Sequence, residues 1–574
     1  MSRYRFVSLT VALFGSTLLA ACGSASDSST SDSSGAGGFG YGPGTGYATG
    51  GSSAAGSGQS SAGSGGGVFG SAGTSSSKGG GSVGAGGSAL PGGAGHPGAA
   101  GAPANGASGA GGVSGMAGAA GMSGMAGMSG MAGMGGAPDA CAGLGKAPIT
   151  LFQSSSSSNS MASPAIVRRE ILRGEPIHPG VVRPYEFMNY YHFHYQPADP
   201  GHLRVVPEMR SDAPGAFHAQ IAIQSPMPEV PRRPMSLTFV LDTSGSMAWD
   251  GRIERLRAVL TSIVGRLAAG DLVSLLTWSD EDTVLLDSYA VTGPDDPVLL
   301  AHVTALQTTG GSDLDTGLEK GYALAFQNYQ KEKTNRVVLI SDGEANVGVT
   351  SAATIGQASH AADEEGVYLV GVNVGAEAGD NLMTIVTDKG RGASVFIDTE
   401  DEAKRMFGEG FDTTMDIAAR AVRLELTVPW YMGLATFSGK ASSTDASVVD
   451  PQHLAPNDAM VFNEVLIACS PGVVQPTDVI KARATWQTPV DHLDRADEVS
   501  ISLAELLATP APHLAKGTAI YDYASLLRQM YSVPKAQTKT DIAKVLAEVK
   551  AANPGGDGDL DEIAMLLQKL DASL

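Results

Sequence analysis

Cysteine is scarce in this chain, with three residues in 574, and one of them is Cys22 near the N-terminus. The other two, Cys141 and Cys469, cannot supply a metal site built on thiolate ligands. In an oxidising compartment they could form one disulfide, although two free thiols are equally compatible with their spacing. The low cysteine content therefore excludes thiolate metal centres and leaves the state of this pair open.

Positive charge is also in short supply. Lys and Arg number 37 against 58 Asp and Glu, which gives a formal net charge of −21. Nucleic acids and anionic lipid surfaces both repel a protein with this balance. We therefore expect no nucleic-acid partner.

Signatures of common enzyme classes are missing as well. Ser246 is followed by Met247, which breaks the G-x-S-x-G pattern, and no H-E-x-x-H or Walker-type motif is present. Phosphatases of the haloacid dehalogenase type need a second Asp two residues after the first, and Ser244 occupies that position after Asp242. The sequence favours a non-enzymatic protein, with a metal-dependent hydrolase as a weaker alternative.

The N-terminus has the features of an export signal. Arg3 and Arg5 precede an apolar segment, residues 6–19, that is too short to span a bilayer as a mature helix. The segment ends in Leu-Ala-Ala-Cys, which resembles a bacterial lipobox. This resemblance implies that Cys22 carries lipid chains that anchor the protein in the bacterial cell envelope. The residue after the lipidated Cys is Gly23 and not Asp, which under the rules for such lipoproteins favours the outer membrane or cell surface.

Residues 23–158 are dominated by Gly, Ser, Ala and Met. A segment of this composition cannot bury enough apolar surface to offset the entropy of ordering it, so we expect a disordered linker. Roughly 120 flexible residues have an end-to-end distance of about 60 Å. The linker would therefore hold the following domains away from the membrane.

Uniformly apolar stretches alternate with helical periodicity between residues 236 and 420. This pattern predicts an α/β, Rossmann-like domain with a mostly parallel sheet covered on both faces. The flanking segments instead alternate apolar and polar residues, as half-buried antiparallel strands do. We expect these flanks to form one β-sandwich into which the α/β domain is inserted. The predicted parts are a signal peptide with its lipobox (1–22), the linker (23–158), an N-terminal flanking segment (159–235), the α/β domain (236–420), a β-rich domain (421–508) and a C-terminal helical segment (509–574).

Oxygen-bearing side chains gather where the apolar stretches end. Asp242, Ser244 and Ser246 follow the first predicted strand, and Asp342 follows another. Ser312 lies in a third loop, just after two glycines. Ligands of open α/β sheets bind beyond the carboxyl ends of the strands, so we expect these loops to meet. Two carboxylates and three hydroxyls form a hard oxygen set that suits Mg²⁺.

This set resembles the metal-ion-dependent adhesion site (MIDAS) of von Willebrand factor type A domains. The resemblance implies that Asp242, Ser244, Ser246, Ser312 and Asp342 hold Mg²⁺, or alternatively Mn²⁺ or Ca²⁺. It also implies a protein partner that completes the metal's ligand shell with a Glu or Asp side chain. The family often has Thr at the position of Ser312. Ser312 keeps the hydroxyl oxygen but lacks the methyl group that restrains the side-chain rotamer of Thr. We therefore expect this ligand to be less pre-organised, without loss of metal binding.

The wider sequence, roughly residues 160–574, resembles bacterial von Willebrand A lipoproteins with a C-terminal domain of unknown function. This wider resemblance indicates architecture better than purpose. The resemblance of the metal site is what implies adhesion or the assembly of surface complexes. The alternative is an envelope scaffold that uses an internal metal site.

Two weaker metal candidates are not favoured. His192 and His194 lack a third ligand and are expected to point apart, so packing or surface roles are preferred. The stretch DGDLDEIAMLLQ from Asp557 lacks the Gly and Glu that a calcium loop requires at its sixth and twelfth positions. Acidic residues in the first turn of a helix explain it better.

Overall fold

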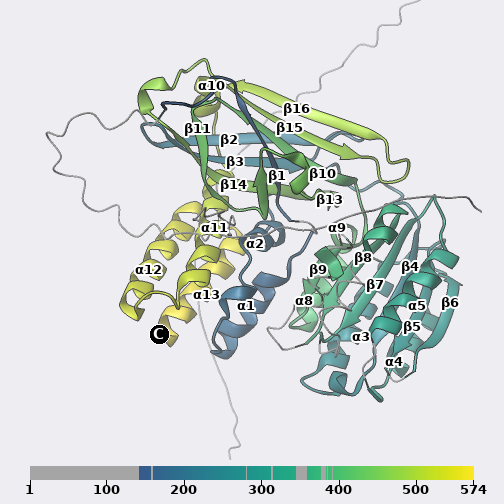
Figure 1. Cartoon of the computed structure of the whole chain (residues 1–574). Helices are drawn as coiled ribbons and strands as arrows, with labels where there is room; N and C mark the ends of the chain where they lie inside the picture. Colours follow the sequence, from purple (N-terminus) through teal and green to yellow (C-terminus); the bar gives the residue numbers. More distant parts are fainter. Residues whose placement is uncertain are drawn as a thin grey trace, which may run out of the picture. The chain divides into compact units, whose positions relative to one another are not determined.

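The computed structural model describes residues 141–156, 159–279, 281–311, 314–343, 359–375, 383, 386–388, 390 and 392–574 (Figure 1). The predicted signal peptide, the lipobox Cys22 and most of the predicted linker lie outside these residues. Ser312 lies outside them too.

A six-stranded sheet forms the centre of the α/β domain, with the strand order β6-β5-β4-β7-β8-β9. All neighbouring strands pair in parallel except β5 and β6, which are antiparallel. The mostly parallel sheet predicted from the sequence is confirmed. The sequence does not predict β6, because none of its residues is buried: each is exposed or half-buried. The strands are β4 (Met235–Asp242), β5 (Leu272–Trp278), β6 (Thr283–Ala290), β7 (Thr334–Ser341), β8 (Val367–Asn373) and β9 (Ala393–Phe396).

Helices cover both faces of this sheet. On one face, Leu256 of α3 (Arg252–Val264) shares a buried core with Phe239 of β4. On the other face, α5 (Leu314–Gln327) packs in a separate core that contains Val240. Neighbouring residues of β4 therefore enter different cores, which explains why the strand is apolar throughout. The domain also contains α4 (Pro297–Ala305), α8 (Glu400–Lys404), the π-helical turn η3 (Arg405–Glu409) and α9 (Phe411–Met415).

Two antiparallel sheets form a sandwich from segments on both sides of the α/β domain. One sheet has the order β11-β14-β3-β2, and the other has the order β12-β1-β10-β15-β16, with β13 paired to β10. Ile221 of β3 and Leu424 of β10 belong to the same buried core between the sheets. Since β3 precedes the α/β domain and β14 follows it, their pairing confirms the predicted insertion. The strands are β1 (Ile149–Ser154), β2 (Arg204–Ala213), β3 (Ala216–Gln224), β10 (Ala419–Val428), β11 (Met432–Phe437), β12 (Ala441–Ser443), β13 (Gln452–Leu454), β14 (Ala459–Ala468), β15 (Val479–Gln487) and β16 (Asp494–Ser502).

The start of the folded body differs from the prediction. The linker was expected to extend to residue 158, but β1 lies within it and pairs with β10 and β12. This strand has only six residues and follows a long Gly-rich segment, so composition hides it. Its partners lie far away in the sequence, and local pattern carries no information about them.

Helices from both ends of the described body pack together (Figure 1). The N-terminal α1 (Ala162–Arg173) and α2 (Pro184–Tyr190) contact the C-terminal α13 (Gly558–Ser573) and α11 (Leu514–Gln529). α12 (Lys535–Ala552) contacts both α11 and α13, the helices before and after it in the chain. α10 (Leu503–Ala508) follows β16. No helix in the described part of the chain combines the length and the apolar character needed to cross a membrane.

The two remaining cysteines are joined. Cys141 and Cys469 form a disulfide with their Cα atoms 5.3 Å apart. The bond ties the first described residue of the chain to the residue that follows β14. Of the two states that the sequence left open, the structure has the disulfide.

A candidate metal centre at the ends of the parallel strands

Asp242 is the last residue of β4, and its side chain is completely buried. Its Oδ1 accepts a hydrogen bond from the backbone N–H of Ser244 at 2.9 Å, which folds the chain back immediately after the strand. Its Oδ2 accepts one from Ser341 Oγ at 2.7 Å, so the neighbouring strand β7 fixes the other oxygen. The carboxylate is therefore held in one orientation by two strands.

The two serines of the motif lie close together. Ser244 Oγ and Ser246 Oγ are 3.0 Å apart, at the start of the 3₁₀ turn η2 (Gly245–Ala248). Neighbouring ligands of an octahedral Mg²⁺, each about 2.1 Å from the ion, are about 3.0 Å apart. The spacing of these hydroxyl oxygens therefore fits two adjacent positions around such an ion.

A second loop is bound to the motif through its backbone. The N–H of Thr309 donates to the carbonyl of Thr243 at 2.7 Å, and the N–H of Gly245 donates to the carbonyl of Gly310 at 3.1 Å. A Cβ atom on Gly245 would lie only 3.1 Å from that carbonyl oxygen, so glycine permits the close approach. These contacts place Thr309 and Gly310 beside the motif; Ser312 is outside the described residues.

Asp342 follows directly after β7 and is also buried. Its Oδ2 accepts a hydrogen bond from Arg252 Nη1 at 2.7 Å. The same nitrogen donates to the carbonyl of Ser246 at 3.3 Å, so one guanidinium joins the second aspartate to the serine turn. The structure thus brings together Asp242, Ser244, Ser246 and Asp342, while their role as metal ligands remains a prediction.

Burial makes the ionised form of Asp242 costly. Burial is the largest cause of a pKa raised to about 6; the neighbouring Asp342 carboxylate acts in the same direction, and hydrogen bonds from Ser244 and Ser341 act against it. A divalent cation between the two aspartates would favour the ionised state of both.

The donor set fits a hard divalent cation, because every side-chain atom offered is a carboxylate or hydroxyl oxygen. In the described residues, no group of three His, Cys, Asp or Glu side chains is placed to hold a metal ion. The centre is compatible with that finding, since hydroxyl groups supply the donors beyond its two carboxylates. The sequence missed Arg252 and Ser341, because neither a helix-starting arginine nor a strand-ending serine stands out without knowledge of what faces it.

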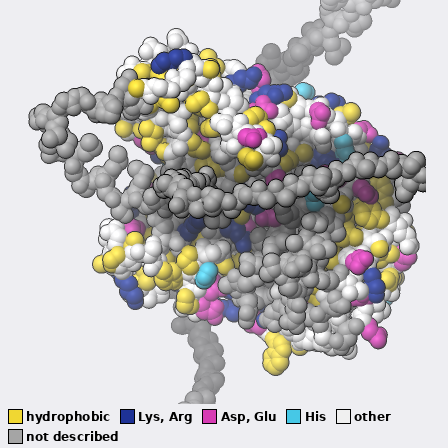
Figure 2. Space-filling view, viewed as in Figure 1, with side chains coloured by type: hydrophobic (Ala, Val, Ile, Leu, Met, Phe, Trp, Pro, Cys, Tyr) yellow, Lys and Arg dark blue, Asp and Glu magenta, His cyan; other side chains and the backbone are white. Residues whose placement is uncertain are grey.

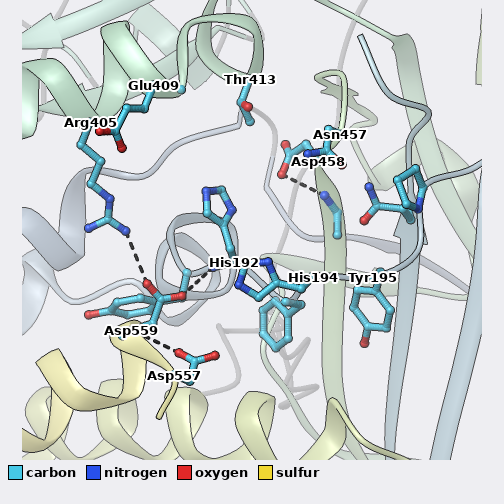
Figure 3. Close-up of a pocket in the computed structure, with 17 residues that line it drawn as sticks. His192, His194, Tyr195, Arg405, Glu409, Thr413, Asn457, Asp458, Asp557 and Asp559 are labelled. Atoms are coloured by element: carbon cyan, nitrogen blue, oxygen red, sulfur yellow. Dashed lines mark hydrogen bonds and ion pairs between the residues drawn. The ribbon is translucent and has the colours of Figure 1, made fainter. Parts of the chain in front are cut away.

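A separate cavity of about 670 Å³ lies where five segments of the body meet (Figure 3). His192 and His194 both line it, with their ring centroids 6.2 Å apart, so the expectation that they point apart is wrong. The segment is not a strand, and His194 has a left-handed φ of 55°. Two of its acidic residues, Asp557 and Asp559, are paired with Lys516 Nζ at 2.7 and 3.0 Å. Asp557 also caps α13, as expected for acids at a helix start.

Comparison with known proteins agrees with the fold. Residues 236–409 match the von Willebrand factor type A domain family, so this part of the chain is a von Willebrand A domain. The chain is related to the uncharacterized protein YfbK of Escherichia coli, with 27% identity over 276 residues, which is 46% of this chain and 47% of that protein. Calcium-activated chloride channel regulator 1 of Bos taurus is 26% identical over 151 residues, 26% of this chain and 16% of that protein. The chain thus spans less than half the length of these curated relatives.

Solved structures with similarity include a von Willebrand factor type A protein from Catenulispora acidiphila. It is 11% identical, and the match covers 66% of this chain and 98% of that chain with a TM-score of 0.45. Proximal thread matrix protein 1 from the mussel byssus, with a zinc-occupied MIDAS motif, is 14% identical. That match covers 31% of this chain and 47% of that chain with a TM-score of 0.26.

Proposed function

We propose that this protein binds a protein partner through a divalent cation held by Asp242, Ser244, Ser246, Ser312 and Asp342. The main support is that two buried carboxylates and two hydroxyls meet at the carboxyl ends of β4 and β7. The two hydroxyl oxygens are 3.0 Å apart. Mg²⁺ is the proposed ion, with Mn²⁺ or Ca²⁺ as alternatives. When bound, it would supply an electrophilic position that accepts a carboxylate from the partner.

The residues of the chain prepare the position for that ion. Ser341 and the backbone of Ser244 each donate to one oxygen of Asp242, so the carboxylate cannot turn away. Hydroxyl ligands add no negative charge, so the bound ion keeps its attraction for an anionic group. We propose no catalytic step, because the carboxylates and hydroxyls of the motif are all assigned to holding the metal.

The place of action is proposed to be the bacterial cell envelope, at the outer membrane or the cell surface. The lipobox at Cys22 would provide the anchor, and residues 23–140 would provide reach. The disulfide supports an oxidising compartment, since such bonds are uncommon in reducing ones.

An envelope scaffold with an internal metal is the alternative, and a metal-dependent hydrolase is a weaker one. Partner capture tests the choice: full-length wild type and Asp242→Ala are isolated from cell envelopes in Mg²⁺ and in chelator. We expect a partner that is retained only by wild type in Mg²⁺. A partner retained equally by both proteins under both conditions would favour the scaffold and contradict metal-dependent recognition.

A further inference from the structure

Arg252 is a buried charge inside the candidate metal centre. Its side chain is 8% exposed, and that of Asp342, to which it is bonded, is 1% exposed. The residue opens α3 directly after Gly251, which has a left-handed φ of 70°. Its backbone N–H donates to the carbonyl of Trp249 at 3.1 Å, so the turn after the motif fixes where the side chain starts.

This arginine changes the charge balance of the centre. From the sequence alone, two carboxylates would just neutralise a divalent cation. With the guanidinium 2.7 Å from Asp342 Oδ2, the three fixed groups sum to a single negative charge when both aspartates are ionised. Arginine keeps its charge at all ordinary pH values, so a change in pH does not relieve this imbalance.

We propose that Arg252 is an internal counter-ion that competes with the divalent cation for Asp342 and thereby sets the metal affinity of the centre. This inference rests on the proposed metal centre. Without metal, the guanidinium neutralises a buried carboxylate that would otherwise destabilise the fold. With metal, it opposes the cation and leaves the loaded centre with a net positive charge, which favours an anionic partner group.

A purely structural role would also explain the ion pair. In that case Arg252 would only hold the start of α3 against the end of β7, through Asp342 and the carbonyl of Ser246. Its loss would then destabilise the protein more in metal than in chelator, because metal affinity would fall as the loops loosened. The two roles therefore predict opposite changes in affinity.

The test is Mg²⁺ titration by calorimetry, with thermal melting in Mg²⁺ and in chelator, on the full chain. Arg252→Gln removes the charge and keeps a donor, and Arg252→Lys keeps the charge. Arg255→Gln is the matched control: Arg255 is on the same helix, but its Nε donates to the carbonyl of Val374 and it pairs with Asp250 at 3.6 Å.

We expect Arg252→Gln to bind Mg²⁺ at least tenfold more tightly than wild type and to melt lower in chelator. Arg252→Lys and Arg255→Gln should stay within about twofold of the wild-type affinity. A glutamine variant that folds only in Mg²⁺ would also support the proposal, because the cation then replaces the lost charge. Equal or weaker Mg²⁺ binding by a folded Arg252→Gln, or failure to fold even in Mg²⁺, would overturn it.

The metal centre itself is checked in the same experiment by Asp242→Ala. If wild type shows no Mg²⁺ heat, or if Asp242→Ala binds as wild type does, the proposed function fails. If Asp242→Ala loses the heat and Arg252→Gln does not tighten binding, only the counter-ion role fails.

Discussion

Gln224 at the end of β3 and Ala459 at the start of β14 are paired in one antiparallel ladder, although the entire von Willebrand A domain lies between them in the sequence. The sandwich is therefore completed only after that domain has been synthesised.

Figure 2 shows hydrophobic, acidic and basic side chains mixed over the visible face of the described body.

The first prediction follows from this split. Residues 159–235 expressed alone should remain unfolded, because β3 would lose its pairing with β14 and the sandwich core would lose its second sheet. Circular dichroism and limited proteolysis would check this. Cooperative unfolding of that fragment by itself would contradict the split sandwich.

A second prediction concerns metal-linked stability. A ligand present at 100 times its Kd adds about 2.7 kcal/mol to the free energy of unfolding. Wild type should therefore melt higher in Mg²⁺ than in chelator, and Asp242→Ala should show no difference. Ser312→Ala should show an intermediate shift, because water can replace one neutral hydroxyl. An equal Mg²⁺ shift in all three proteins would place the metal elsewhere.

A third prediction concerns Glu464, which is buried in β14. Burial raises the pKa of its carboxyl to about 7, while a hydrogen bond from Gln153 Nε2 at 2.7 Å lowers it. Its other oxygen, Oε1, has no hydrogen-bond partner among the described residues. Because the folded pKa lies above the unfolded value, this group's stabilisation is complete below about pH 4.5 and is lost as the pH rises through about 7.

Glu464→Gln should therefore be more stable than wild type at pH 8, by up to about 3 kcal/mol in the free energy of unfolding. The difference should shrink as the pH falls toward 4.5. Urea denaturation at pH 5 and pH 8 measures it. A variant that is less stable than wild type at pH 8 would show that the ionised carboxylate is better compensated than its contacts indicate.

The disulfide gives a fourth prediction. Removing it with Cys469→Ser should lower the free energy of unfolding by about 2–4 kcal/mol. Wild type treated with a reductant should unfold at the same urea concentration as the variant, and the variant should not respond to the reductant. If reductant leaves wild type unchanged while the bond is shown to be cleaved, the bond contributes nothing to stability.

The fifth prediction concerns the anchor. Cys22→Ser should move the protein from the membrane fraction to the soluble fraction, because the modified thiol would be lost. Fractionation followed by immunoblotting measures this. Ser24→Ala, two residues further on, is the control and should stay with the membrane; retention of both variants would contradict lipid anchoring at Cys22.

The sequence was most informative where function depends on neighbouring residues. Asp242, Ser244 and Ser246 lie within five residues of sequence, and Asp342 could be added because it follows an apolar stretch. Arg252 could not be added, since its importance depends on a side chain from another strand that only the folded chain brings near. β1 was missed for the same reason: pairing with β10 and β12, and not local composition, makes it a strand.

The bond between Cys141 and Cys469 also sets the path of mechanical load. A pull on the N-terminal side of the chain reaches Cys141 before it reaches β1, and the covalent bond passes it to the residue just beyond β14. β14 is held by β3 on one side and β11 on the other. If the protein is anchored and bound as proposed, a load applied through the partner would fall on the inner strand β14, and β1 would not be peeled away first.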